Sequence, residues 1–242
     1  MPDQEKLTYS SYLRLDQLLA AQEPRSSEHD EMLFIVIHQV YELWFKQLLH
    51  ELTKLQLLLE AGESTHSMRT LRRVLAILKI VVAQLDVLET MTPAQFRTFR
   101  DALGTSSGFE SLQFRELEAT LGRRDFPKWA PQPEAAARPS VFDSYLQYLT
   151  TQGYEIPAER SGDAIQQVLK HVYDDDASAA AISELLVDVD EGIQEWRYRH
   201  VKMVERTIGG QHGTGGSTGA AYLSSTVGKP IFPDLWAMRS LG

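Results

Sequence analysis

The chain has 242 residues, 43% of them hydrophobic and 24% charged, which is ordinary for a globular protein with one sizeable core. Its formal net charge of −9 argues against nucleic acid or an anionic membrane surface as a partner, because both bind concentrated lysine and arginine. The absence of cysteine excludes disulfides, thiolate-bound haem and cysteine-held iron–sulfur clusters.

The hydrophobic pattern along the chain has a helical period, and strand signals are scarce. We therefore expect an all-α protein, a single helical-bundle domain that covers residues 1–242. The expected helices are 8–21, 30–61, 67–90, 93–103, 108–121, 140–151, 162–173, 178–209 and 218–227, followed by a short turn near 232–239. Residues 123–139 hold four of the ten prolines and should form an extended connection.

The N-terminus has no basic segment followed by an apolar core. No apolar run approaches the roughly 18 residues that a membrane-spanning helix needs. We therefore expect a cytoplasmic protein with no membrane segment, whose partner is a small molecule.

The expected helix 30–61 contains a histidine, His38, in apolar and aromatic surroundings. Phe34, Tyr41 and Phe45 stand at i−4, i+3 and i+7 from His38, so the imidazole shares a helix face with three aromatic rings. One interpretation is a core histidine whose nitrogens are satisfied by other protein groups. The other is a pocket with one polar chemical group.

Arg100 and Arg115, in the segment 96–118, are candidate binding residues. Arg100 has Phe96 at i−4 and Leu103 at i+3, so its guanidinium shares a helix face with apolar side chains. Such an arginine requires an anion, and its forked donors suit a carboxylate of a ligand. An internal ion pair with one of the 33 acidic residues is the alternative, and Arg115 admits the same two interpretations.

The expected helix 178–209 carries the second histidine, His200, on its core-facing seam. A bound metal or cofactor could serve both His38 and His200, since buried polar groups need partners. The two residues belong to no local zinc or calcium motif. A haem with one histidine below and one above it fits better. The glycine-rich segment 212–219 follows, either as a mobile loop over the pocket or as a flexible linker.

Five blocks, in this order, resemble the tryptophan 2,3-dioxygenase family: LTYSSYLRLDQLL, HDEMLFIVIHQVYELWFKQLLHEL, FRDALGTSSGFESLQFR, WRYRHVKMVERTIG and GTGGSTG. They cover about half of the chain. The resemblance implies a helical bundle that encloses a b-type haem and cleaves the indole C2–C3 bond of L-tryptophan with O2. The implied product is N-formylkynurenine, and the implied assembly is a homotetramer.

The resemblance also implies roles for residues near the haem. His200 matches the proximal ligand of the haem iron, and Trp196 would pack beside the haem one turn away. Arg115 would pair with a haem propionate, and Ser107 would lie near the porphyrin.

For the substrate, the resemblance implies that His38 is the distal histidine, which contacts the indole nitrogen, and that Phe34 lines the indole pocket. Arg100 would bind the substrate carboxylate and Thr214 its ammonium group. At Phe96 some family members carry a tyrosine that assists the carboxylate clamp, so one hydrogen bond, worth roughly 1 kcal/mol, is missing here. The three remaining positions, Tyr9, Tyr12 and Leu13, match a segment that completes the site of a neighbouring subunit.

The chain departs from the family in its middle, because only about 70 residues separate Trp129 from Trp196. Two alternatives stay open, and the shortened region is the feature that supports the first of them. One is a family member that acts on a substituted tryptophan or another indole, with insertion of one oxygen rather than two. The other is a non-catalytic protein that binds haem or tryptophan.

Overall fold

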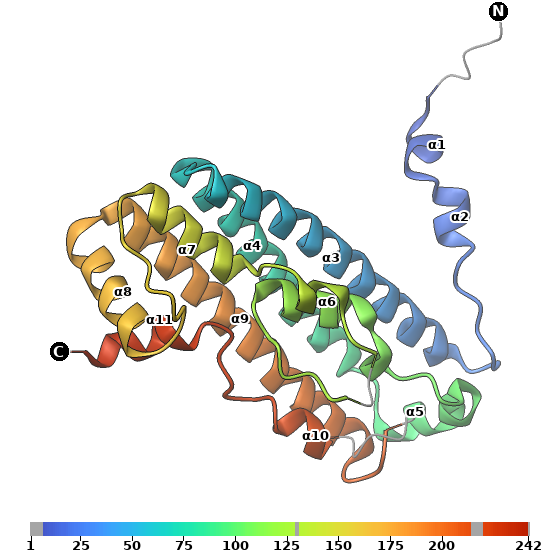
Figure 1. Ribbon diagram of the computed structural model, residues 1–242. Helices are drawn as coiled ribbons and strands as arrows, with labels where there is room; N and C mark the ends of the chain where they lie inside the picture. The colour runs from blue at the N-terminus through green and yellow to red at the C-terminus, as the bar shows by residue number, and fades with distance from the viewer. Residues whose placement is uncertain (1–6, 129–130, 214–219, 242) are drawn as a thin grey trace, which may run out of the picture.

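The computed structural model describes residues 7–128, 131–213 and 220–241. Three long helices run side by side and form the centre of a bundle: α3 (His29–Glu60), α4 (Ser64–Leu88) and α9 (Ala177–Ile208) (Figure 1). The described residues contain helices and no strand, so the expected all-α fold is confirmed.

The buried positions of these helices follow the apolar period of the sequence. The buried side chains of α3 recur every three or four residues: Ile37, Tyr41, Phe45, Leu48, Leu52, Leu55 and Leu59. Those of α9 have the same spacing from Ile182 through Leu186, Val189 and Ile193 to Trp196, and Met203 follows two turns later. Because that spacing aligns side chains along one face, each helix presents a continuous apolar stripe to its neighbours.

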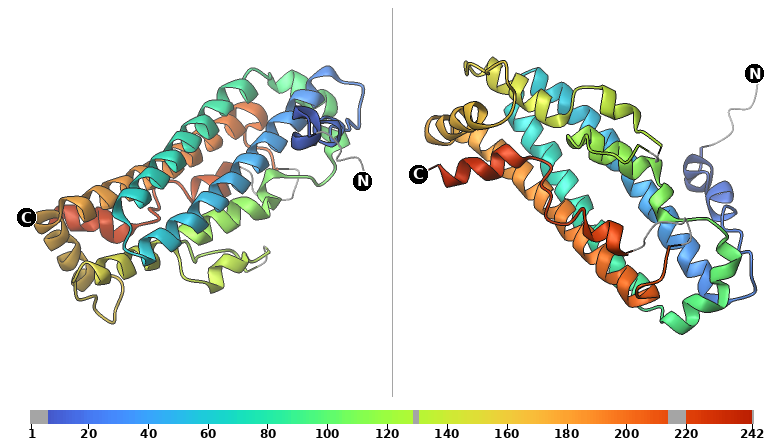
Figure 2. Two further views of the ribbon diagram at one scale, coloured as in Figure 1. Left: turned by 90° about the horizontal axis from the view of Figure 1, so that it is seen from above. Right: turned by 60° about the horizontal axis from the view of Figure 1, so that its bottom comes forward.

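Shorter helices cover the central three. Helices α6 (Leu112–Leu121) and α7 (Val141–Thr151) pack against α3, whereas α8 (Asp163–Asp175), α10 (Ala220–Ser224) and α11 (Pro233–Ala237) pack against α9. Helix α5 (Pro93–Phe99) closes the end of the bundle where α3 begins and α9 ends, as Figure 2 also shows. The 3₁₀ turns are η1 (Arg100–Leu103), η2 (Gly108–Glu110), η3 (Glu134–Ala137) and η4 (Met238–Ser240).

Local chemistry fixes several helix ends. Thr92 and Gln95 form a capping box at the start of α5, with Pro93 at its first position. Gly209 ends α9 with a φ of 61°, a left-handed conformation that costs glycine little. These boundaries agree with the expected ones.

The N-terminal part differs from its expectation. The expected helix 8–21 is two short helices, α1 (Tyr9–Leu13) and α2 (Leu15–Leu19), because Arg14 takes a left-handed φ of 53°. We call residues 7–20 the N-terminal arm. Neither helix of the arm buries a side chain, and the arm stands away from the bundle (Figure 1).

The other differences are small. The expected helix 93–103 continues as α5 and then tightens into η1, and the connection 123–139 contains η3. Residues 214–219, which hold most of the glycine-rich segment and the start of the expected helix 218–227, lie outside the described residues. Within the described ranges, no helix is long and apolar enough to cross a membrane.

Candidate functional site

A large pocket lies at the end of the bundle where α3 begins and α9 ends. Residues from α3, α4, α5, α6 and α9 line it, together with the loop after η1 and the segment after α10. Residues that the sequence singled out share this lining: Phe34, His38, Phe96, Arg100, Ser107, Arg115, Trp196 and His200. Segments that are far apart in the sequence therefore meet at one cavity.

His38 lies on α3 one turn after Phe34, with its imidazole hydrogen-bonded to the helix backbone. Its Nδ1 is 2.7 Å from the carbonyl oxygen of Phe34. Since a carbonyl oxygen only accepts, Nδ1 carries the proton and the neutral ring keeps a lone pair on Nε2. Burial lowers the pKa of His38, which keeps the ring neutral near physiological pH. The residue is therefore an acceptor on the pocket wall.

His200 lies on α9, across the pocket from α3. Burial, and to a lesser extent repulsion from His38, lower the pKa of His200 to about 4, so its imidazole is neutral near physiological pH. Among the described residues, none is hydrogen-bonded to the His200 ring. One turn earlier, Trp196 stacks on it with ring centroids 4.8 Å apart and an interplanar angle of 25°. The ring is held in place while its nitrogens remain able to bind a ligand.

Aromatic side chains form the wall next to His38. The ring centroid of Phe34 is 4.1 Å from that of His38 and 5.8 Å from those of Phe96 and Phe99. Phe96 and Phe99 come from α5, which packs against the first turns of α3. The wall is apolar apart from the His38 imidazole, which suits a flat aromatic ligand with one polar edge.

Arg100 lies at the junction of α5 and η1 and is half-buried. Its Nη1 donates to Oε1 of Gln211, and its Nη2 donates to the carbonyl oxygen of His212, 2.6 Å away. Both acceptors are neutral, so the internal ion pair that the sequence allowed is absent from the described residues. The guanidinium keeps an uncompensated positive charge at this end of the pocket.

Arg115 and Ser107 lie on the α6 side of the pocket. Arg115 is buried, with 6% of its surface exposed, and its Nη1 lies 3.5 Å from the carbonyl oxygen of Pro131. Ser107 is half-buried and takes part in further contacts.

Sequence reasoning missed three further charged residues that line the pocket: Glu118, Arg123 and Arg197. Glu118 of α6 accepts from Nη2 of Arg197 at 2.5 Å and from Nη1 of Arg123 at 2.8 Å. Arg197 also donates to the carbonyl oxygen of Lys229, 2.9 Å away. The sequence held one usable signal, because Arg197 is one helical turn from His200 and so shares its face.

Four arginines and one glutamate line the pocket: Arg100, Arg115, Arg123, Arg197 and Glu118. The lining is therefore cationic in a chain whose formal net charge is −9. In a partly buried site such an excess attracts anionic groups of a ligand. Among the described residues, no group of three or more histidine, aspartate or glutamate side chains could hold a metal ion.

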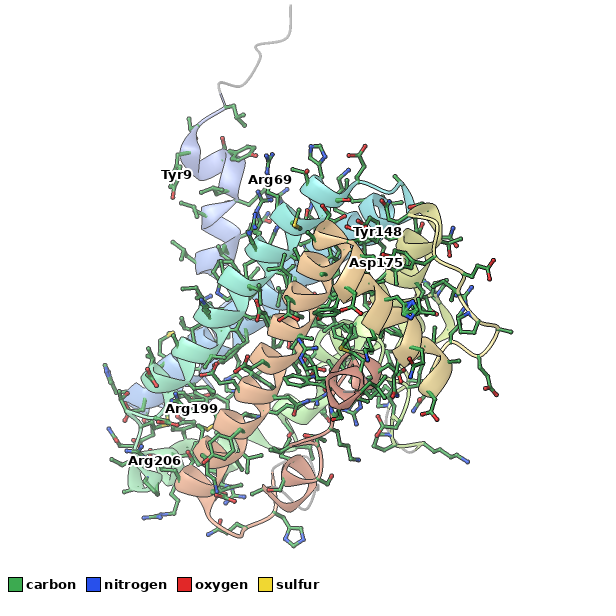
Figure 3. The ribbon with its side chains drawn as sticks, turned by 90° about the vertical axis from the view of Figure 1, so that its left-hand side faces the viewer. Tyr9, Arg69, Tyr148, Asp175, Arg199 and Arg206 are labelled. Carbon is green, nitrogen blue, oxygen red and sulfur yellow. The ribbon has the colours of Figure 1, made fainter. Side chains whose placement is uncertain are left out.

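Other predicted site residues are not part of this pocket. Tyr9, Tyr12 and Leu13 lie on the N-terminal arm, with 76%, 69% and 40% of their surfaces exposed. Figure 3 shows Tyr9 on α1, apart from Arg199 and Arg206 on the last turns of α9. Thr214 lies outside the described residues.

Comparison with known proteins gives consistent matches. A family model described as tryptophan 2,3-dioxygenase matches residues 2–129 and 132–241. A tryptophan 2,3-dioxygenase of Anaeromyxobacter dehalogenans is 60% identical over 252 residues, which cover 96% of this chain and 95% of the relative. One of Herpetosiphon aurantiacus is 53% identical over 257 residues, covering 98% of each chain. Both alignments are longer than the 242 residues of this chain, so these relatives contain residues that it lacks.

Proposed function

The chain belongs to the tryptophan 2,3-dioxygenase family, and from this premise we propose that it is an oxidoreductase that cleaves the indole C2–C3 bond of L-tryptophan with O2. The product is N-formylkynurenine, which keeps all atoms of tryptophan and gains both atoms of O2. One observation carries the proposal. A single pocket has a neutral histidine on each of two facing helices, His38 and His200, and an arginine, Arg100, that has no acidic partner among the described residues.

A b-type haem is the cofactor that this pocket fits. His200 is neutral and its ring has no hydrogen-bond partner in the described part of the chain, so it has a lone pair for iron. The indole N–H of Trp196 is buried and also lacks a partner there. Arg115, on the cationic lining of the pocket, suits a propionate of a haem. A ferrous haem supplies the dioxygen chemistry when it is bound.

The substrate binds as a zwitterion between His38 and Arg100. The indole ring lies against Phe34 and Phe96, and its N–H donates to the lone pair on Nε2 of His38. Arg100 binds the carboxylate, and Thr214 receives the ammonium group. Because the pKa of His38 is lowered, the imidazole stays an acceptor and orients the indole without needing to act as a strong base.

The protein assembles as a homotetramer in which the N-terminal arm reaches the site of a neighbouring subunit. Support comes from the exposure of Tyr9 and Tyr12, large side chains that no part of their own bundle covers. An exposed apolar segment of this kind is typical of a contact with another chain.

The test is turnover by purified, haem-loaded protein that has been reduced without oxygen and then given L-tryptophan and ¹⁸O₂. The expected product is heavier than tryptophan by two ¹⁸O atoms. A product with one labelled atom would indicate monooxygenation instead. Haem binding without turnover of L-tryptophan would favour a substituted indole, and a protein that binds no haem would disprove the proposal.

A further inference from the structure

The two outer nitrogens of Arg100 are both occupied at the start of the glycine-rich segment, by Gln211 just before it and by His212, its first residue. Nη1 donates to the side-chain oxygen of Gln211, and Nη2 donates to the backbone oxygen of His212. These contacts span more than 100 residues of sequence, since Arg100 and Gln211 are 111 positions apart. In the described part of the chain, no carboxylate oxygen lies within 4.0 Å of a guanidinium nitrogen of Arg100, the limit for an ion pair. The oxygens that the described residues offer to Arg100 are thus neutral.

The position of Gln211 is fixed by the end of α9. The N–H of Gly209 donates to the carbonyl oxygen of Glu205 at 2.9 Å, and the N–H of Gln211 donates to that of Ile208 at 3.2 Å. Ile208 itself lines the pocket. The side chain of Gln211 therefore extends from a hydrogen-bonded turn at the pocket rim. Because the backbone there is already ordered, the hydrogen bond to Arg100 costs little further backbone entropy.

Together, Gln211 and His212 imitate a carboxylate. Two oxygens meet two nitrogens of one guanidinium, which is the pattern of an arginine–carboxylate pair. A carboxylate binds a guanidinium more strongly than neutral oxygens do, because the attraction between opposite charges adds to the two hydrogen bonds. A substrate carboxylate can therefore displace them, but part of its interaction with Arg100 replaces hydrogen bonds that already exist.

We propose that Gln211 determines the affinity for the substrate carboxylate, because its side-chain oxygen occupies Arg100 until the substrate displaces it. The proposal rests on the function given above, in which Arg100 binds that carboxylate. It makes Gln211 a competitor of the substrate rather than a ligand for it. Removal of the amide should strengthen binding of any indole that carries a carboxylate.

The expected effects have opposite signs for two substitutions. Gln211→Ala removes one competing hydrogen bond and should lower the Kd for L-tryptophan about threefold to tenfold. Gln211→Glu places a charged competitor on Arg100 and should raise that Kd by roughly tenfold or more. Tryptophanol replaces the carboxylate by a neutral hydroxymethyl group, so neither substitution should change its Kd as much.

The experiment is calorimetric titration of the holoenzyme with L-tryptophan and with tryptophanol. Gln152→Ala, at an exposed glutamine at the other end of the bundle, is the matched control and should leave both Kd values unchanged. Tightening by Gln211→Ala that is confined to L-tryptophan supports the proposal. Unchanged or weaker binding of L-tryptophan, or equal tightening of both ligands, would overturn it.

A further variant separates this proposal from the function on which it rests. Arg100→Ala should weaken the binding of L-tryptophan strongly and the binding of tryptophanol only a little. If it does so while Gln211→Ala has no effect, Arg100 binds the substrate carboxylate as proposed, but Gln211 does not compete with it. If Arg100→Ala leaves the Kd for L-tryptophan unchanged, Arg100 is not the clamp and both proposals fail.

Discussion

His38 and His200 line one pocket, yet their rings differ in hydrogen bonding. Nδ1 of His38 is bonded to the Phe34 carbonyl, whereas the described residues supply no such partner for His200. Both neutral rings keep a lone pair, and it is the resemblance to the family that assigns His200 to the iron and His38 to the substrate. We expect His200→Ala to lose haem, and His38→Ala to keep haem with a kcat/KM lower by roughly tenfold, the effect of about one hydrogen bond.

The measurement is the haem content of each purified variant after saturation with haem, followed by steady-state kinetics. His171→Ala changes an exposed histidine on α8 and should match the unmodified protein in both. Full haem occupancy with an unchanged spectrum in His200→Ala would remove His200 from the iron.

Periodicity was sufficient to predict which residues of α3 and α9 share a face, and therefore that Phe34 and His38 lie together. It could not predict the ion pair between Glu118 and Arg197, which are 79 residues apart. Each is charged, and a charged residue at a helical position is normally solvent-facing, so nothing local marks either as buried. For Arg100 the sequence left a ligand carboxylate and an internal ion pair as alternatives, and the described residues form no such ion pair. Its contacts with Gln211 and His212 depend on tertiary structure alone.

Among the elements, the start of α3 is joined to the preceding loop by hydrogen bonds to a buried carboxylate. Glu31 accepts from the backbone N–H groups of Arg25 and Ser26, each at 2.7 Å, and from the Ser26 hydroxyl. Burial opposes ionisation of Glu31, but these hydrogen bonds outweigh it and lower its pKa below 4.5. A lowered pKa means that the folded state favours the ionised form.

This carboxylate should make stability depend on pH. Its contribution is present above the ordinary pKa of 4.5 and is lost as the pH falls through the lower pKa of the folded state. We expect Glu31→Gln to reduce the free energy of unfolding by about 1–3 kcal/mol near neutral pH. Urea unfolding at a series of pH values should show the two proteins converging in acid. A constant difference at all pH values would contradict the assignment.

A second carboxylate fastens the C-terminal segment to α9. Asp190 is fully buried and accepts from the N–H groups of Ile231 and Phe232, at 2.8 and 2.9 Å, and from the indole N–H of Trp236 at 3.0 Å. Asp190→Ala should destabilise the fold by about 3 kcal/mol, because buried donors lose their acceptor. Thermal unfolding measures this loss. Asp188→Ala, at an exposed aspartate two residues earlier, should have little effect.

Helix boundaries were predictable where the sequence has a cap or a glycine, as at Thr92 and Gly209. The break in the N-terminal arm was not. Arg14 adopts a left-handed conformation in an apolar-periodic segment without glycine or proline, so local propensity favours an unbroken helix. Because α1 and α2 bury no side chain against the bundle, packing within the chain does not determine whether the arm forms one helix or two.

In the molecule as a whole, the bundle and the arm differ in how much apolar surface they bury. The bundle has a continuous buried core, whereas α1 and α2 bury no side chain, and the arm leaves Leu7, Tyr9, Tyr12 and Leu19 between 69% and 76% exposed. Deletion of residues 1–20 should therefore leave the helical content and melting temperature of the bundle nearly unchanged. The same deletion should reduce activity and the size of the assembly, which light scattering after size exclusion would measure.

If the arm completes the site of a neighbour, two defective chains should rescue each other. The deletion variant has an intact pocket but no arm, and Arg100→Ala has an intact arm but a damaged pocket. Co-expressed, they form mixed assemblies in which the arm of one chain meets the pocket of the other, so activity should exceed that of either variant alone. An arm that folds back on its own subunit cannot produce this rescue, because every chain then carries a defect in its own site.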